Sequence, residues 1–231
     1  MGGLLKSVLD LLFPPRCAGC HRRGDWLCRE CWQSLPRLPQ SVCRRCGRPL
    51  EGVFVCSLCY RQPPPFEALR SACYFEGITR EMIHRLKYRR ARHLAAPLAQ
   101  LLTPLLLHLS EPVDLIVPVP LFPSRQAARG YNQSTLLAAE LARGLNLPVS
   151  EDGLRRLRDT PAQIGLSAAE RQRNVRGAFA GERSLLDGRR VLLIDDVCTT
   201  GATISACAKA LKRAGAQSVI ALTVARAQPG F

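Results

Sequence analysis

The chain has 231 residues, which is enough for one domain of ordinary size and a smaller second one. Hydrophobic residues make up 47% of it, enough for a packed core, and this share excludes a disordered chain. Lys and Arg number 33 against 18 Asp and Glu, which gives a formal net charge of +15. This surplus favours polyanionic partners, nucleic acid first, because neutralised phosphates release counterions. The alternative is that codon bias produced the arginines and that they serve only solubility.

Residues 3–13 are mostly apolar but are interrupted by Lys6 and Asp10 and end at Pro14. The run is too short to span a bilayer, and it lacks the charged start and the cleavage site of a signal peptide. Its spacing predicts a short amphipathic helix that packs on the protein, with docking to a membrane or a partner as the alternative. We therefore expect a cytoplasmic protein that is not an integral membrane protein.

Eight cysteines between residues 17 and 59 form four Cys-x-x-Cys pairs, and each pair makes a turn that can aim two sulfurs at one cation. Gaps of seven and nine residues let a short hairpin join consecutive pairs, which predicts two structural Zn²⁺ ions in closed four-thiolate sites. The alternatives are a cross-braced pairing and four disulfides, although disulfide frameworks belong to secreted chains. The expected ligands are Cys17, Cys20, Cys28 and Cys31, then Cys43, Cys46, Cys56 and Cys59.

The run Arg-Gln-Pro-Pro-Pro at 61–65 predicts a stiff, extended linker between two cores. We expect an N-terminal helix and metal ribbons over residues 1–62 and a second domain over 63–231. Strands and helices then alternate, which predicts a doubly wound α/β domain with a parallel sheet and ligands at the carboxyl ends of its strands. Strands are expected at 71–76, 114–119, 178–179, 191–194 and 219–225, and helical stretches at 79–107, 134–145 and 202–214.

A basic run lies in the first helical stretch, with Tyr88, His84 and His93 interleaved. Cations can follow a phosphate backbone while an aromatic ring stacks on a base, so the run is a candidate site for single-stranded DNA. Two alternatives stand beside it: a solvated basic face, and support of the ligand edge of the sheet by Lys87 and Tyr88. The candidate residues are Arg85, Lys87, Arg89, Arg90 and Arg92, with Arg80 just before them.

Two further segments carry arginines and amides. Arg125, Arg129, Asn132 and Gln133 follow the strand expected at 114–119, where guanidinium groups suit diphosphate oxygens. The segment 155–179, which includes Arg171, is a candidate for a flap that closes over a substrate. The alternative for this segment is a solvated loop.

Residues 191–203 are the most informative part of the chain. An apolar strand without polar alternation, as expected for a buried parallel strand, leads into Asp195 and Asp196. The turn that follows offers backbone N–H groups, threonine hydroxyls and the start of a helix, which suit a phosphate. The acids suit sugar hydroxyls or a metal-bound diphosphate, so the segment predicts a site for a phosphorylated ribose. The turn comprises Val197, Cys198, Thr199, Thr200, Gly201, Ala202 and Thr203.

Two simpler interpretations apply to this segment. Any turn between a strand and a helix can carry acids and threonines. Cys198 is expected to be a passive loop residue rather than a nucleophile, because no nearby histidine can act as its base.

The segment resembles the motif for phosphoribosyl pyrophosphate (PRPP) in type I phosphoribosyltransferases, and the whole chain resembles the ComF family of competence-associated proteins. The resemblance rests on the four cysteine pairs, Leu86-Lys87-Tyr88, Val117-Pro-Val-Pro, Arg129-Gly-Tyr-Asn-Gln, Thr160-x-x-Gln163 and the acid pair. It implies a double zinc ribbon fused to a phosphoribosyltransferase fold. It also implies Mg²⁺ bound with PRPP, the handling of single-stranded DNA in natural transformation, and partners in the competence machinery such as a helicase.

Three functions follow from these expectations. The first is a DNA-uptake accessory that uses the phosphoribosyltransferase fold. The second is an enzyme that transfers ribose 5-phosphate from PRPP to an unidentified base or other acceptor. In that case the catalytic residues Asp195 and Asp196 orient the ribose as positive charge develops at C1, while Mg²⁺ and arginines stabilise the departing pyrophosphate. The third is a zinc-ribbon adaptor whose sheet only senses PRPP.

Overall fold

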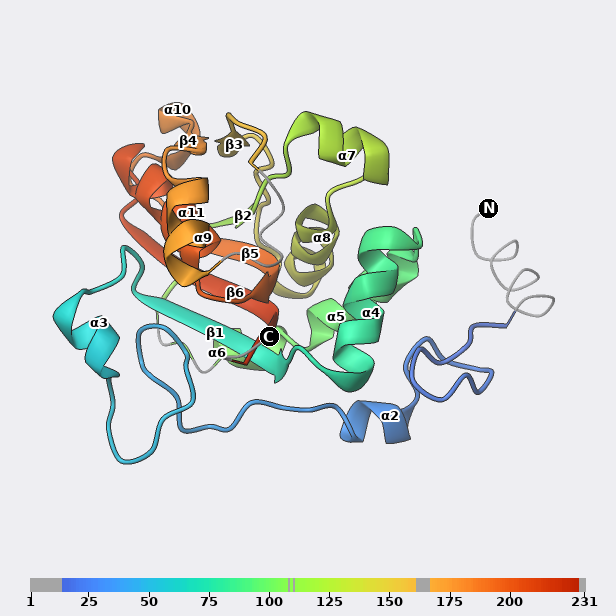
Figure 1. Ribbon diagram of the computed structural model, residues 1–231. Coiled ribbons are helices and arrows are strands. Elements are labelled where there is room, and N and C mark those ends of the chain that lie inside the picture. Colours follow the sequence, from blue (N-terminus) through green and yellow to red (C-terminus); the bar gives the residue numbers. More distant parts are fainter. Residues whose placement is uncertain (1–13, 108, 110, 161–166, 229–231) are drawn as a thin grey trace.

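A parallel sheet of four strands forms the centre of the structure, a computed structural model that describes residues 14–107, 109, 111–160 and 167–228 (Figure 1). The strand order is β1-β6-β5-β2, and all three neighbouring pairs are parallel. The fold class predicted from the alternation of strands and helices is confirmed. The strands are β1 (Ala68–Tyr74), β2 (Leu115–Pro118), β5 (Arg190–Cys198) and β6 (Ser218–Arg226).

Strand β5 is covered on both faces, which explains its uninterrupted apolar sequence. Leu192 and Ile194 belong to a core cluster that includes residues of α4 (Gly77–Tyr88), α5 (Ala95–Gln100) and α8 (Gln133–Leu145). Val191 and Leu193, which point to the opposite face, pack in a second cluster with residues of α11 (Ala202–Arg213). Both faces are therefore buried, as a parallel sheet requires.

The helical stretch expected at 79–107 is divided into four elements. Helix α4 ends before Arg90, whose φ of +52° is left-handed and cannot continue an α-helix. Pro97 and Pro104 lie in the first turns of the helices that follow, where a missing N–H is tolerated. The elements after α4 are η1 (Arg92–Leu94), α5 and α6 (Thr103–Leu107).

Strand β5 is longer than the sequence predicts, because its pairing with β6 continues beyond its pairing with β2, which ends at Ile194. Its register with β6 continues from Arg190 to Cys198, and Asp195 lies opposite Thr223. The two acids therefore lie within the last part of the strand and not beyond it.

A short antiparallel pair lies apart from the main sheet. It is formed by β3 (Leu154–Arg156), which the sequence analysis missed, and β4 (Phe179–Gly181). The remaining helices of this region are α7 (Pro123–Arg129), α9 (Ala168–Val175) and α10 (Arg183–Leu186).

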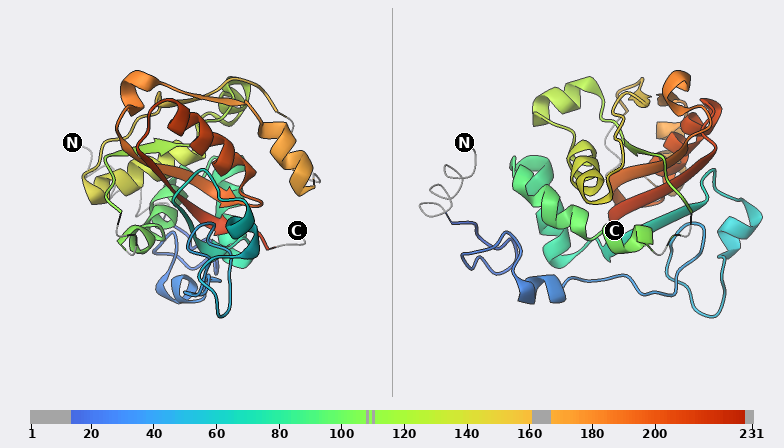
Figure 2. Two further views of the ribbon diagram at one scale, coloured as in Figure 1. Left: turned by 90° about the vertical axis from the view of Figure 1, so that its left-hand side faces the viewer. Right: turned by 180° about the vertical axis from the view of Figure 1, so that it is seen from behind.

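The cysteine-rich segment runs along the outer edge of β1, with the short helices α2 (Arg29–Gln33) and α3 (Ser57–Arg61) (Figures 1 and 2). The N–H of Leu38 donates to the carbonyl of Ala72 (3.1 Å), and the N–H of Leu69 donates to the carbonyl of Arg45 (2.7 Å). Ala18 and Leu35 join the core cluster that contains α4. The cysteines of each group also form a buried cluster of their own, and the domain boundary between residues 62 and 63 stays a prediction.

Among the described residues, no helix is both long and apolar enough to cross a membrane. The amphipathic helix expected at 3–13 lies outside the described residues.

Asp114 and Arg190 join the starts of two neighbouring strands. The Asp114 carboxylate accepts bonds from the Arg190 backbone N–H (2.8 Å), Nε (2.9 Å) and Nη2 (2.5 Å). These bonds lower the pKa of Asp114 from 3.8 to about 2. The folded state therefore stabilises the ionised Asp114 carboxylate more than the unfolded state does.

This pair predicts a contribution to acid stability. Because the folded pKa of Asp114 is depressed, the stabilisation is present above about pH 4 and is lost as the pH falls towards about 2. Urea unfolding over this window should show a steeper loss of unfolding free energy for the native chain than for Asp114→Asn. Asp187→Asn, which alters an exposed carboxylate, is the matched control. Parallel curves for the native chain and Asp114→Asn would contradict the prediction.

Candidate functional site

The eight paired cysteines gather in two groups of four, and the sulfur atoms of each group lie within 4.8 Å of one another. The grouping is sequential, so the cross-braced alternative is wrong. All of them are free thiols, and Sγ of Cys17 and Sγ of Cys28 are 3.6 Å apart, well beyond a disulfide bond of about 2.05 Å. The disulfide alternative is also wrong. The groups are Cys17, Cys20, Cys28 and Cys31, and Cys43, Cys46, Cys56 and Cys59.

Each group contains one thiol that favours the thiolate. Burial raises the pKa of Cys17 and Cys43, but backbone N–H groups more than offset it, and both pKa values fall to about 6. Burial raises the pKa of Cys31 to about 12, so the thiols of one group differ. Four soft sulfur donors around a preformed thiolate fit Zn²⁺, and they leave no coordination position open for a substrate.

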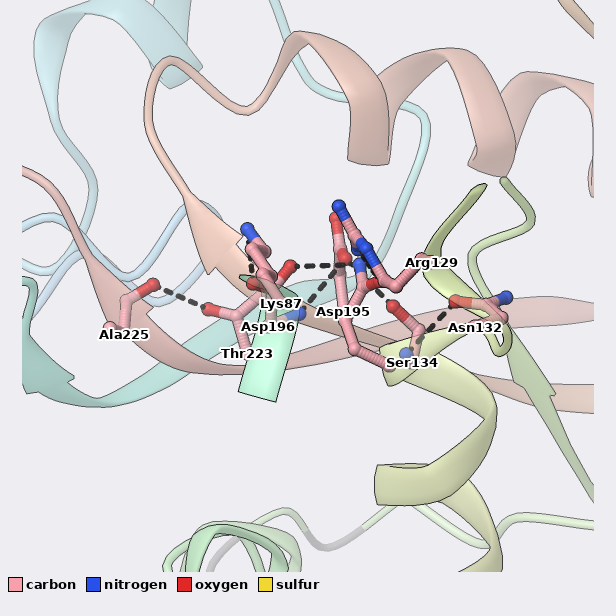
Figure 3. Close-up of polar contacts among 9 residues, drawn as sticks. Lys87, Arg129, Asn132, Ser134, Asp195, Asp196, Thr223 and Ala225 are labelled. Carbon is pink, nitrogen blue, oxygen red and sulfur yellow. Dashed lines mark hydrogen bonds and ion pairs between the residues drawn. The ribbon is translucent and has the colours of Figure 1, made fainter. Parts of the chain in front are cut away.

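The acid pair lies near the end of β5 and is almost fully buried (Figure 3): Asp195 is 8% exposed and Asp196 is 3% exposed. Oδ1 of Asp195 accepts bonds from the Ser134 hydroxyl (3.0 Å) and from the Asp196 backbone N–H (2.9 Å). Oδ1 of Asp196 accepts a long bond from Nε2 of Gln133 (3.4 Å). The first turn of α8 thus holds both carboxylates.

Lys87, in the last turn of α4, completes this cluster: its ammonium group forms an ion pair with Oδ2 of Asp196 (Figure 3). Burial and the adjacent Asp196 raise the pKa of Asp195, whereas Lys87 more than offsets burial and lowers the pKa of Asp196. One negative charge of the pair is therefore balanced by one lysine. Of the alternatives open for Lys87, the structure favours support of the ligand edge.

The other members of the basic run differ in their surroundings. Arg85 forms an ion pair with Glu81 (2.6 Å), whereas Arg89, Arg90 and Arg92 are exposed. Nη2 of Arg92 donates to the carbonyl of Gly130 (2.9 Å).

The residues expected to bind a diphosphate do not all lie beside the acid pair. Arg129 donates to the side chain of Gln133, which in turn contacts Asp196. Asn132 caps α8 by accepting from the Ser134 N–H (3.0 Å) and donates to the carbonyl of Val119 (2.9 Å).

Arg125 lies one turn before Arg129 in the same helix, α7. It forms an ion pair with Asp159 (3.1 Å) and donates to the carbonyl of Thr160. Arg129 and Gln133 thus adjoin the acid pair, Asn132 shapes the start of α8, and Arg125 ties α7 to the segment after β3.

The threonine-rich turn joins β5 to α11. Gly201 precedes the helix with φ of +81°, a left-handed conformation that favours glycine, and the Ala202 N–H donates to the Thr200 hydroxyl (3.4 Å). Cys198 is 2% exposed, and burial raises the pKa of its thiol. A neutral, buried thiol agrees with a passive role for Cys198.

The candidate flap is folded at both described ends. Strands β3 and β4 pair with each other, and α9, which carries Arg171, begins with a capping box between Ser167 and Glu170. Gln163 lies outside the described residues, so closure of the flap stays a prediction.

The sequence analysis missed Ser134 as a partner of the acid pair. Its only signal was its place in the first turn of a helix that follows a parallel strand, at the edge where ligands bind. Thr223 lies opposite Asp195 and shares a buried hydrogen bond with Ser71 (2.6 Å), which fixes β6 against β1 at this level.

Comparison with known proteins divides the chain into two parts. Residues 8–60 match the family model of the double zinc ribbon domain, and residues 132–230 match that of the phosphoribosyl transferase domain. The parallel sheet is therefore that of a type I phosphoribosyltransferase-like fold, preceded by two four-cysteine zinc-ribbon sites.

Three relatives cover most of the chain. DNA utilization protein YhgH of Escherichia coli (strain K12) is 35% identical over 203 residues, which are 85% of this chain and 88% of that protein. Competence protein F of Haemophilus influenzae is 32% identical over 224 residues, 92% of this chain and 97% of that protein. Competence protein ComFC of Bacillus subtilis is 29% identical over 208 residues, 87% and 84% of the two chains.

The two cysteine groups predict two zinc ions per chain, measured by elemental analysis of native protein. Cys17→Ser removes a thiolate from the first group and should lower the content to one ion per chain, because an S₄ site depends on all of its ligands. Cys198→Ala, which changes a buried cysteine outside both groups, should retain both ions. Less than one zinc per native chain would refute the assignment.

Proposed function

We propose, from the premise that the chain belongs to the ComF family of competence and DNA utilization proteins, that its sheet domain binds PRPP at the end of β5. The observation that carries this proposal is a single strand end that bears two acids and leads, within a few residues, into a threonine-rich turn and a helix N-terminus. A sugar phosphate likewise carries hydroxyls and a phosphate group in one molecule. The role that we propose for the protein is in DNA uptake and the handling of single-stranded DNA.

The turn from Val197 to Thr203 is suited to the 5′-phosphate. Helix α11 has 12 residues and begins at Ala202, so its positive end and its first N–H groups face the turn. The left-handed Gly201 lets the backbone bend closely around an anion. Asp195 and Asp196 would accept hydrogen bonds from the ribose hydroxyls, which are the donors nearest to that phosphate.

The diphosphate would enter with Mg²⁺ as part of the substrate. Arg129 adjoins the acid pair through Gln133, so its guanidinium group is placed to meet diphosphate oxygens. Arg125 would need to leave Asp159 before it could reach them. If transfer from PRPP occurs, the two acids stabilise the positive charge that develops at C1 of the ribose.

The acid pair predicts Mg²⁺-dependent binding of PRPP, measured by titration calorimetry. Asp196→Asn keeps the shape of the side chain but removes one charged acceptor, which should cost about 1.5–3 kcal/mol, or roughly ten- to hundredfold in affinity. Asp187→Asn, an exposed change, is the matched control and should bind as the native chain does. Absence of PRPP binding by the native chain would refute the assignment and leave only the fold.

The part of the basic run that begins at the end of α4 is the surface that we propose for single-stranded DNA. Arg89 and Arg90 are exposed, and Tyr88 is 61% exposed with its ring 4.8 Å from that of His84. Two cations beside exposed rings combine charge attraction with stacking, the two contributions on which single-strand binding depends. Helicase-like partners in the competence machinery would meet the protein through the bound strand.

This surface predicts a salt-dependent affinity for single-stranded oligonucleotides, with a slope of about −0.7 per contacted phosphate. Arg89→Ala with Arg90→Ala should reduce both the affinity and the slope and should spare PRPP binding. Arg143→Ala with Arg213→Ala removes the same charge from two other exposed positions and is the control. An unchanged slope in the first variant would move the site, with Arg22, Arg23, Arg44 and Arg45 of the ribbons as the next candidates. No binding at low salt would reject the nucleic-acid role.

A further inference from the structure

Helix α4 connects the first zinc ribbon to the acid pair. Near its start lies Ile78, and in its last turn lies Lys87, whose ammonium group contacts Asp196 (Figures 1 and 3). Between them Met82, Ile83 and Leu86 are fully buried in the core. A helix whose apolar face is packed in the core along its length transmits the position of one end to the other as a rigid element.

The first ribbon, residues 17–31, contacts the chain both before and after Lys87 in the sequence. Ile78 packs against the cluster of Cys17, Cys28 and Cys31, and a Cβ atom added to Gly19 would lie 2.8 Å from Cδ1 of Ile78. Beyond the helix, the ring of Trp26 stacks on that of His93 in η1, with ring centroids 3.7 Å apart and an angle of 27° between the planes.

The second ribbon, residues 43–59, contacts the sheet and not α4 or η1 in the bonds that follow. Nη1 of Arg70, in β1, donates to the carbonyl of Arg44 (2.9 Å), and Arg226, in β6, donates to the carbonyl of Cys46. The two metal sites are therefore anchored to different elements, and the second ribbon provides a natural comparison for the first.

The end of α4 is also held from the side of the acid pair. The Tyr131 hydroxyl donates to the carbonyl of Leu86, and the guanidinium group of Arg92 lies over the ring of Tyr131 at 4.6 Å. The Lys87 side chain is 21% exposed, whereas that of Asp196 is 4% exposed. A carboxylate this deeply buried needs a nearby cation, because a buried charge without a partner is strongly destabilising.

We propose that Lys87 is a positioning residue of the sugar-phosphate site, and that the first zinc ribbon, acting through α4, holds it against Asp196. Lys87 orients one of the two carboxylates that meet the ribose. The effect on PRPP affinity rests on the proposed function, whereas the position of Lys87 does not. The two parts are therefore tested separately.

The first experiment measures the position of Lys87 without any ligand. Lysines are few in this chain, so reductive methylation followed by mass spectrometry can compare Lys87 with the exposed Lys209 in the same molecule. Trp26→Ala with Ile78→Ala removes the contacts of the first ribbon with η1 and α4. Phe54→Ala with Leu58→Ala truncates two exposed apolar side chains of the second ribbon and is the matched control.

The expected result is a several-fold faster modification of Lys87 relative to Lys209 in the first variant, and a native ratio in the control. An unchanged ratio in the first variant would overturn the role of the ribbon. An equal increase in both variants would overturn it as well, because the effect would not be specific to the first ribbon.

The second experiment measures PRPP affinity in the same proteins. Lys87→Met should weaken binding by about tenfold, Lys87→Arg should restore part of the loss because it keeps the charge, and the first-ribbon variant should weaken binding in the same direction. Thermal unfolding identifies any variant that fails to fold. If Lys87→Met does not fold, the PRPP affinities of the first-ribbon variant and its control test the proposal.

Native affinity in a folded Lys87→Met would overturn the role of Lys87. If the native chain binds no PRPP, the proposed function fails, and the methylation ratio alone then decides whether the first ribbon positions Lys87.

Discussion

The pairing of β5 on both sides is the constraint on which the rest of the structure depends. Because β2 flanks its first part, β6 flanks it as far as Cys198 and helices cover both of its faces, the end of this strand has a fixed place in the protein. The acids in its last part and the turn that follows take their positions from that strand. A binding loop carried by such a strand is preorganised, so a ligand would meet groups already held in place and bind with less loss of chain entropy.

Placing two adjacent carboxylates inside a sheet is unfavourable unless the surroundings compensate. Here the compensation comes from two elements that are distant in sequence, through Lys87 of α4 and Ser134 of α8, and from the neighbouring backbone N–H of Asp196. The pKa values of the two acids move in opposite directions as a result. Such a separation of two neighbouring acids is typical of functional sites.

Features encoded by local spacing could be predicted from the sequence, whereas features that depend on tertiary pairing could not. Cysteine spacing alone indicated the sequential metal groups, because each Cys-x-x-Cys turn is a local structure. The length of β5 depended on its register with β6, and the partners of the acids depended on how α4 and α8 pack. The sequence left Lys87 open between a basic face and support of the ligand edge, and Asn132, expected near a diphosphate, instead caps α8.

The backbone contacts between the ribbons and β1 have a consequence for how the chain is made. Among the strands that the structure describes, β1 pairs in the sheet with β6 alone, and its Ser71 meets Thr223, which lies 152 residues later. While the ribosome is still producing the intervening residues, β1 has no sheet partner, and an unpaired strand invites association with other chains. The segment around Leu38 and Arg45 is already synthesised by then and can bond to the other edge of β1. The cysteine-rich segment would therefore cover one edge of β1 during synthesis and protect this strand from association with other chains.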